Sequence, residues 1–283
     1  RLTGLDAGFL WMETPSSAMH VSGLAVYDPT DLAEQGRSFG IDDVKAMIRG
    51  RLHLAPPFRQ RLVEVPLQLH FPLWIEDPAF DLDQHVRQAT VPAPGGLREL
   101  AEVAARLNAT QLDRSRPLWE LWYLEGLEDG RVATLTKVHH AAIDGASGSE
   151  ITVALFDLSP EVATHPEPDE PWRPDPVPTD VEMLTYAATS LARQPRRVVR
   201  ALRRTGEATL RVGQMARGAT SHLAPLPFTA PATSFNGAIS ARRSISMATL
   251  SLTDVKRVKN AFGATVNDVV LALCGSAVRR YLA

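Results

Sequence analysis

Residues 138–145 read Val-His-His-Ala-Ala-Ile-Asp-Gly, and the expected fold and site are both built around this stretch. It follows residues 131–137, Arg-Val-Ala-Thr-Leu-Thr-Lys, a run rich in strand-forming residues. In an extended segment, successive side chains point to opposite faces. His139 and His140 therefore cannot both face one cavity if the strand continues through them. The pattern predicts a strand that ends in two histidines with different surroundings.

The segments around this strand alternate between strand and helix patterns. Strands are expected at residues 19–27, within 61–72, at 119–126 and at 131–139, the last two being joined by a turn at 128–130. Helices are expected at 41–53, 97–107 and 147–155, where apolar residues recur at helical spacing. Strands mixed with helices, without strict alternation, predict an α/β or α+β layered domain.

The chain changes character after this region. Residues 160–180 carry seven prolines among acidic residues, which is typical of an extended linker. Residues 181–217 resume a helical pattern with eight arginines against two glutamates, and Pro195 is expected to kink or split that helix. A strand–helix pattern begins near Ser240, and residues 267–283 read as a helix. We therefore expect a first domain at 1–160, a linker and helical crossover at 161–235, and the start of a second domain at 236–283, within a longer protein.

Composition excludes several classes of protein. A net charge of −2 gives no general attraction to nucleic acid. The single Cys274 excludes a disulfide framework within this sequence and fits a reducing cytoplasm. The sequence contains no uninterrupted apolar run of about 20 residues and does not open on a signal-peptide pattern.

The histidine motif suits general-base chemistry on a hydroxyl or amine. A neutral imidazole can accept a proton from an attacking hydroxyl near pH 7. We assign that role to His140, four residues before Asp144, and expect Asp144 to hold the loop or pair with an arginine. Gly145 allows a turn geometry and keeps bulk away from His140. The alternative is a pair of hydrogen-bonded structural histidines at a strand end.

Other chemistries are less well supported by the sequence. Adjacent histidines diverge, and the chain has neither an HExxH motif nor a second cysteine, so we expect no metal site. Ser147 lacks the GxSxG pattern of a serine nucleophile. No phosphate-binding loop and no dinucleotide-binding glycine motif is present.

Three stretches together resemble the bacterial wax ester synthase/acyl-CoA:diacylglycerol acyltransferase family. They are the HHxxxDG motif, the Pro-Leu-Trp-Glu of residues 117–120 and the Asn-Asp of residues 267–268. Residues 5–10 and 234–237 are also similar to that family, and the resemblance runs over nearly the whole chain. HHxxxDG alone is shared with condensation domains of peptide synthetases. The other stretches are therefore needed to indicate the acyltransferase family in particular.

The resemblance implies a CoA-dependent acyltransferase-like fold of two similar mixed-sheet domains, of which only the first is complete here. It implies that His140 lies in a channel, with acyl-CoA entering from one side and diacylglycerol or a fatty alcohol from the other. No cofactor is expected beyond acyl-CoA as co-substrate. His139, Asp144 and Gly145 would complete the catalytic motif, and Trp119, Asn267 and Asp268 would line the substrate site.

Each of these residues has a structural alternative. Trp119 is expected mainly to pack in the core, Asp268 to cap a helix and Cys274 to be a buried small apolar side chain. Arg242 or Arg243 is available as a partner for Asp144. The arginines of residues 193–217 are expected either to form a solvated face or to contact anionic lipid, which would place the protein at the cytoplasmic membrane face or on lipid droplets. Competing functions are a condensation-type enzyme that uses carrier-bound thioesters and a lipid-surface binding protein without activity.

Overall fold

The computed structural model describes residues 2–143, 155, 172–174, 176–192 and 233–283. The chain divides into two compact units: residues 1–199 with 240–245, and residues 200–239 with 246–283. The described elements of the first unit are α1 (Gly4–Met12), β1 (His20–Tyr27), α2 (Thr30–Glu34), α3 (Ile41–Arg51), β2 (Gln60–Val63), β3 (Leu73–Glu76), β4 (Val86–Thr90), α4 (Leu97–Ala109), β5 (Trp119–Glu125), β6 (Val132–His139) and α6 (Asp180–Ala192). Short 3₁₀ turns lie at Leu52–Leu54, Pro56–Arg59, Pro66–Gln68, Leu82–Gln84 and Glu128–Gly130.

A four-stranded mixed sheet is the centre of the first unit. Its order is β1-β6-β5-β4, with β1–β6 and β6–β5 antiparallel and β5–β4 parallel. The register pairs His20 with His139 and Trp119 with Val138. The mixed sheet confirms the predicted α/β class, and the strands expected at 19–27, 119–126 and 131–139 are all present.

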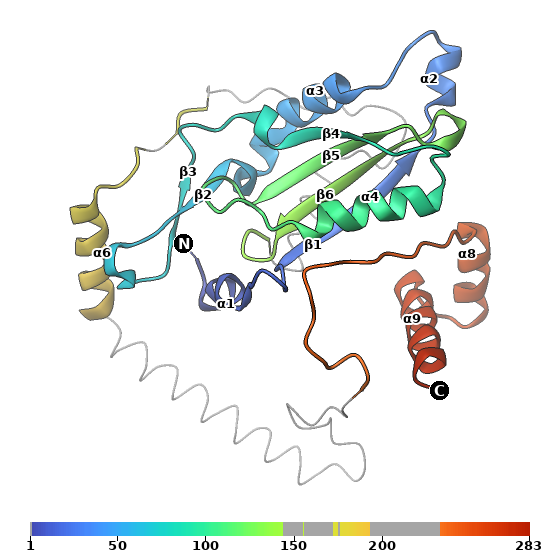
Figure 1. The fold of residues 1–283 in the computed structure, drawn as a ribbon. Coiled ribbons are helices and arrows are strands. Elements are labelled where there is room, and N and C mark those ends of the chain that lie inside the picture. Colours follow the sequence, from blue (N-terminus) through green and yellow to red (C-terminus); the bar gives the residue numbers. More distant parts are fainter. Residues whose placement is uncertain (1, 144–154, 156–171, 175, 193–232) are drawn as a thin grey trace. The chain divides into compact units, whose positions relative to one another are not determined.

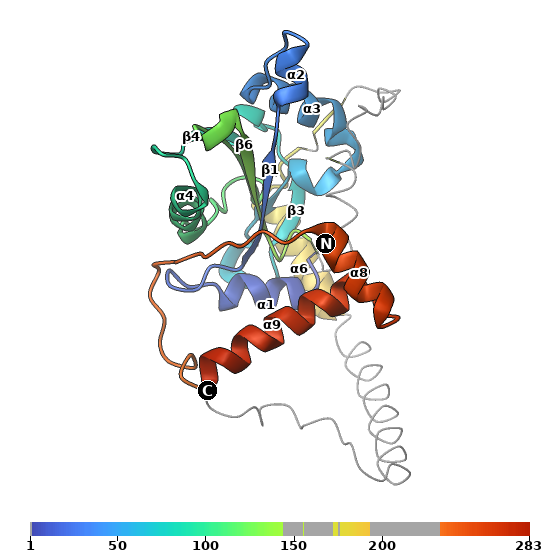
Figure 2. The ribbon, with the colours of Figure 1, turned by 90° about the vertical axis from the view of Figure 1, so that its right-hand side faces the viewer.

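Helices cover both faces of this sheet. Figure 2 shows α3 on one side of the sheet and α4 on the other. Val44 and Ile48 of α3 are fully buried against Trp119, Leu121 and other inward residues of the strands. On α4 the buried side chains recur at helical spacing, as the sequence predicts. The central strand β6 is consequently buried on both faces along most of its length.

A second, smaller core lies where β6 ends. Ala7 and Leu10 of α1 pack there with Leu118 and Ala141. Leu118 directly precedes β5, and its carbonyl oxygen accepts a hydrogen bond from the His139 N–H at 3.0 Å. The Pro-Leu-Trp stretch and the histidine motif are thus neighbours in space because β5 and β6 pair, although about twenty residues separate them in sequence (Figure 1).

The strand pattern expected within residues 61–72 is only partly correct. A strand covers Gln60–Val63 and pairs with Leu73–Glu76, but the residues between them form a 3₁₀ turn. Leu67 and Gln68 have φ angles of 57° and 51° there, which an extended strand excludes. Pro66 also removes a backbone donor that a central strand would need. Helix α6 packs on this hairpin through Met183 and Ala187.

The described part of the second unit holds α8 (Leu252–Ala261) and α9 (Val266–Leu282). Helix α9 confirms the helix predicted near residues 267–283, whereas residues 240–250 contain no strand. A strand needs a partner to satisfy its backbone groups, and a pattern of side chains alone does not supply one. No single helix among the described residues passes a length-and-apolarity test for a membrane span; α8 and α9, bent by 99°, pass it only as a pair.

Residues 181–192 confirm the start of the helix expected at 181–217, and residues 193–217 lie outside the described part of the chain. The helix expected at 147–155 lies outside it too, except for Leu155, which is buried in the main core. The domain boundaries expected after residues 160 and 235 stay a prediction.

Candidate active site

His139 is the last residue of β6, and its side chain is buried. Its side chain is 1% exposed, and its Nδ1 accepts a hydrogen bond from the Ala141 N–H at 2.9 Å. An imidazole nitrogen that accepts is unprotonated, so the proton of the neutral ring lies on Nε2. Burial lowers the pKa of His139 to about 4, even though the nearby Glu13 carboxylate acts in the opposite direction. His139 is therefore neutral at pH 7 and fixed in one tautomer.

His140 has different surroundings. It begins the turn after β6, is half-buried, and stacks on the Phe9 ring of α1 with ring centroids 4.8 Å apart and planes at 18°. Its backbone N–H donates to the Met19 carbonyl oxygen at 2.8 Å. Both histidines have a hydrogen-bonded backbone N–H, but only the side chain of His140 is partly accessible.

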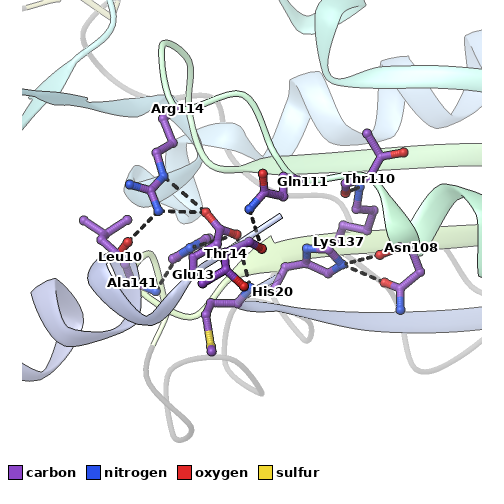
Figure 3. Close-up of polar contacts among 12 residues, drawn as sticks. Leu10, Glu13, Thr14, His20, Asn108, Thr110, Gln111, Arg114, Lys137 and Ala141 are labelled. Carbon is purple, nitrogen blue, oxygen red and sulfur yellow. Dashed lines mark hydrogen bonds and ion pairs between the residues drawn. The ribbon is translucent and has the colours of Figure 1, made fainter. Parts of the chain in front are cut away.

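Glu13 lies directly after α1 and joins several parts of the site, as the close-up in Figure 3 shows. Its Oε2 accepts from Nε and Nη2 of Arg114 at 3.2 and 2.8 Å, and its Oε1 accepts from the Met19 N–H at 3.1 Å. Oε1 also lies 3.6 Å from Nε2 of His139. Burial by itself would raise the pKa of Glu13, but the hydrogen bonds from Arg114 and Met19 outweigh it and hold that pKa below its usual value. Glu13 is thus a charged carboxylate whose side chain is 2% exposed.

A buried lysine lies on the same face of β6, two residues before His139. Lys137 is fully buried, and its Nζ donates to the Thr110 carbonyl at 2.7 Å and to Oε2 of Glu120 at 3.3 Å. Burial lowers the pKa of Lys137, while the charge of Glu120 opposes the shift. The sequence did not predict that Lys137 would be buried. The residues next to it in the chain do not indicate which distant segments pack against it.

His20 of β1 lies opposite His139 in the sheet. Its Nε2 contacts the Asn108 carbonyl oxygen at 3.0 Å and the Asn108 side-chain oxygen at 2.8 Å (Figure 3). Both are acceptors, so Nε2 carries the proton and Nδ1 is left as an acceptor. Burial and the charge of Lys137 lower the pKa of His20. Like Lys137 and Arg114, His20 and Glu13 lie near the motif and were not predicted from the sequence, since they come from a different strand and the end of a helix.

The remaining expected site residues are placed as follows. Trp119 is 2% exposed, donates its indole N–H to the Phe58 carbonyl at 2.8 Å and stacks on His85, which is the packing role expected of it. Asp268 was expected to cap the helix, but Thr265 is the N-cap of α9; Asp268 lies in the first turn and accepts from the Thr265 N–H and hydroxyl at 2.8 Å each. Asn267 is exposed on α9, in the second unit. Substrate contact by these three residues stays a prediction.

Asp144 and Gly145 lie outside the described part of the chain, so their roles stay predictions. Arg243, one of the arginines considered for Asp144, donates from Nη2 to the Ser16 carbonyl at 2.8 Å. Cys274 is exposed and not buried as expected, within the described helix α9. The described residues contain no group of three or more histidine, cysteine or carboxylate side chains placed to hold a metal ion.

In this structure, a histidine pair lies at the end of the central strand β6 of a mixed sheet. The comparisons identify the class: residues 2–270 match the wax ester synthase/diacylglycerol acyltransferase catalytic domain, and the chain belongs to that family. The family resemblance expected from the sequence is thereby confirmed.

Two proteins of Mycobacterium tuberculosis, each provisionally named a diacylglycerol O-acyltransferase, are 38% identical to this chain over its whole length. The chain spans 55% and 58% of their lengths. The wax ester synthase/diacylglycerol acyltransferase of Marinobacter aquaeolei VT8 has a similar structure, with a TM-score of 0.60 and 29% identity over 99% of this chain and 59% of its own. This likeness confirms the expected fold. The activity, substrates and partners of the whole protein are inferred below.

Proposed function

We propose that the protein is an acyl-CoA-dependent O-acyltransferase that transfers a long-chain acyl group to diacylglycerol or a fatty alcohol, with His140 as general base. Membership of the family supports the reaction class. The observation that supports the assignment of the base is the contrast within the histidine pair: His139 is 1% exposed and committed to the Ala141 N–H, whereas His140 is half-buried.

The proposed reaction needs one proton carrier. The acceptor hydroxyl loses its proton to His140 as its oxygen attacks the thioester carbonyl carbon. A C–O bond forms, the C–S bond breaks, and the CoA thiolate leaves with the proton that His140 received. The products are an ester and free CoA, and no covalent enzyme intermediate is required. Phe9, stacked on the imidazole, would hold the ring in one orientation through this exchange.

The acceptors are lipids, and we propose that the protein meets them at a membrane face or lipid-droplet surface in the cytoplasm. The arginines of residues 193–217 support this proposal through their charge, since each basic residue near an anionic surface contributes about 1 kcal/mol. The chain spans 55% and 59% of the lengths of two relatives, and we propose that a further C-terminal part of the protein completes the substrate site.

Substitution of each histidine tests the proposal. The protein at its natural full length is assayed with palmitoyl-CoA and either hexadecanol or diacylglycerol, and the products are resolved by chromatography. His140→Ala should lower kcat by about 10²- to 10⁴-fold while the protein remains folded. His139→Ala should mainly lower stability, because it removes a buried side chain and leaves the Ala141 N–H without its acceptor.

Two outcomes would contradict the proposal. Equal turnover by wild type and His140→Ala, at equal concentrations of folded protein, would exclude His140 as the base. Ester formation from a carrier-bound thioester but never from acyl-CoA would instead assign the protein to the condensation-type enzymes.

A further inference from the structure

We propose that Glu13 is a positioning residue for His140, which it holds through the Met19 peptide on one side and His139 on the other. The inference rests on the proposed role of His140 as the base. Glu13 itself does not need to touch substrate. No pattern in the sequence marks it, because it lies 127 positions before His140.

The first connection runs through one peptide unit. Glu13 Oε1 accepts the Met19 N–H at 3.1 Å, and the carbonyl oxygen of Met19 accepts the His140 N–H at 2.8 Å. Met19 directly precedes β1, so its position sets how the end of β1 meets the turn after β6. The carboxylate thus fixes the residue to which the His140 backbone is bonded.

The second connection runs through His139. Its Nε2–H is buried, has no hydrogen-bond partner among the described residues and lies 3.6 Å from Glu13 Oε1. The carboxylate is the negative charge next to this proton and favours the tautomer in which Nδ1 is free to accept from the Ala141 N–H. That bond spans His140 and closes the turn that carries it.

Glu13 is itself fixed by two contacts. Its N–H donates to the Phe9 carbonyl at 3.2 Å as α1 ends, and Phe9 is the residue stacked on His140. Arg114 donates hydrogen bonds from two nitrogens to Oε2 of Glu13, and it also donates to the Leu10 carbonyl at 2.6 Å. Glu13 is therefore connected through its carboxylate to Met19 and His139, and through its backbone N–H to Phe9, whose ring stacks on His140. A buried carboxylate with this many partners costs desolvation energy, which a role in packing alone does not require.

Glu13→Gln is the sharpest test, because it changes neither size nor shape. One carboxylate oxygen faces donors at Met19 and His139, and the other faces donors at Arg114. A glutamine has only one oxygen, so its NH₂ group must oppose a donor on one side. We expect kcat to fall by about 10-fold or more, since small misplacements of a catalytic group have effects of that order, while KM for palmitoyl-CoA changes little.

A second substitution distinguishes positioning from simple loss of a buried pair. In Glu13→Gln/Arg114→Met, the glutamine NH₂ can turn to the side that Arg114 has vacated, and its oxygen can again accept from Met19. We expect the double variant to recover kcat relative to Glu13→Gln. The matched control is Glu102→Gln, which breaks the exposed 3.3 Å pair with Arg98 and should leave kcat unchanged.

A readout without substrate keeps this inference separate from the proposed activity. The rate at which diethyl pyrocarbonate modifies His140, followed by peptide mass spectrometry, should rise in Glu13→Gln and return toward wild type in the double variant. Absence of ester formation by the wild type would refute the proposed function, yet the modification rates would still decide whether Glu13 positions His140. Should Glu13→Gln not fold, Arg114→Lys provides the same comparison, since lysine keeps the charge but not the two-nitrogen contact.

The inference is wrong if Glu13→Gln lowers only the melting temperature, with kcat per folded protein and the His140 modification rate both unchanged. It is also wrong if the double variant is no more active than Glu13→Gln. A parallel fall in Glu102→Gln would show that the assay responds to charge in general.

Discussion

Lys137 should stabilise the first unit even though burying a charge is costly. It is fully buried on β6, and its Nζ has two described partners, the Thr110 carbonyl at 2.7 Å and Glu120 at 3.3 Å. Lys137→Met keeps most of the length of the side chain and removes the charge and both bonds. The substitution therefore isolates the polar contribution of this residue.

The expected loss of stability in Lys137→Met follows from the interactions that each partner of Lys137 loses. Thr110 is exposed, so loss of the hydrogen bond to its carbonyl costs about 0.5–1.5 kcal/mol, and the charge-assisted bond to Glu120 contributes about 1.5–3 kcal/mol. Relief of the lysine desolvation penalty, several kcal/mol per ion, acts in the opposite direction. Glu120 also retains the Trp122 indole N–H at 3.1 Å and Arg87 at 4.0 Å. We expect a net loss of about 2 kcal/mol, below the ~3–5 kcal/mol for a buried charge left with no partner.

Urea unfolding followed by tryptophan fluorescence measures this loss. All five tryptophans, at positions 11, 74, 119, 122 and 172, belong to the first unit, so the signal reports on that unit. In a double-mutant cycle with Glu120→Gln, the double variant should lose less stability than the sum of the two single variants. Lys45→Met, which breaks the 2.8 Å surface pair with Asp83, is the control and should shift the urea midpoint little.

Two results would refute this reasoning. Lys137→Met could prove neutral or stabilising, which would mean that desolvation exceeds the two bonds. The cycle could also be additive within about 0.5 kcal/mol, which would mean that Lys137 and Glu120 do not interact.

Two further predictions concern the histidine pair and the core beside it. The pKa of His139 in the folded protein is about 4, against an ordinary 6.5. The neutral ring therefore contributes to the stability of the folded state above pH 6.5, and this contribution is lost as the pH falls toward 4. Over that range wild type should lose up to about 3 kcal/mol more stability than His139→Gln, and urea unfolding with equal pH dependence in both proteins would contradict this. Trp119→Phe should cost about 1–2 kcal/mol through the bond to Phe58, and Trp119→Ala about 3–5 kcal/mol. A raised KM for palmitoyl-CoA at unchanged stability would instead show that Trp119 contacts substrate.

Local pattern was enough to predict the central elements of the fold. Strands β1, β5 and β6 and helices α3, α4 and α9 follow from residue types and spacing that persist over seven or more residues. The turn between β2 and β3 was missed because Leu67 and Gln68 adopt φ angles that apolar alternation does not reveal. Side-chain alternation also anticipated that His139 and His140 would have different surroundings.

The sequence by itself determined which residues can do chemistry: a histidine pair at a strand end, next to a motif shared with one family. Only the tertiary structure decided which histidine is buried, which one stacks on Phe9 and which carboxylate is connected to both. The physical reason is that burial and hydrogen bonding depend on residues far apart in the chain. Glu13, His20, Arg114 and Lys137 come from four separate segments, and pairing of β1 and β5 with β6 brings them together. A pKa near 4 for His139 exists only in that assembled environment.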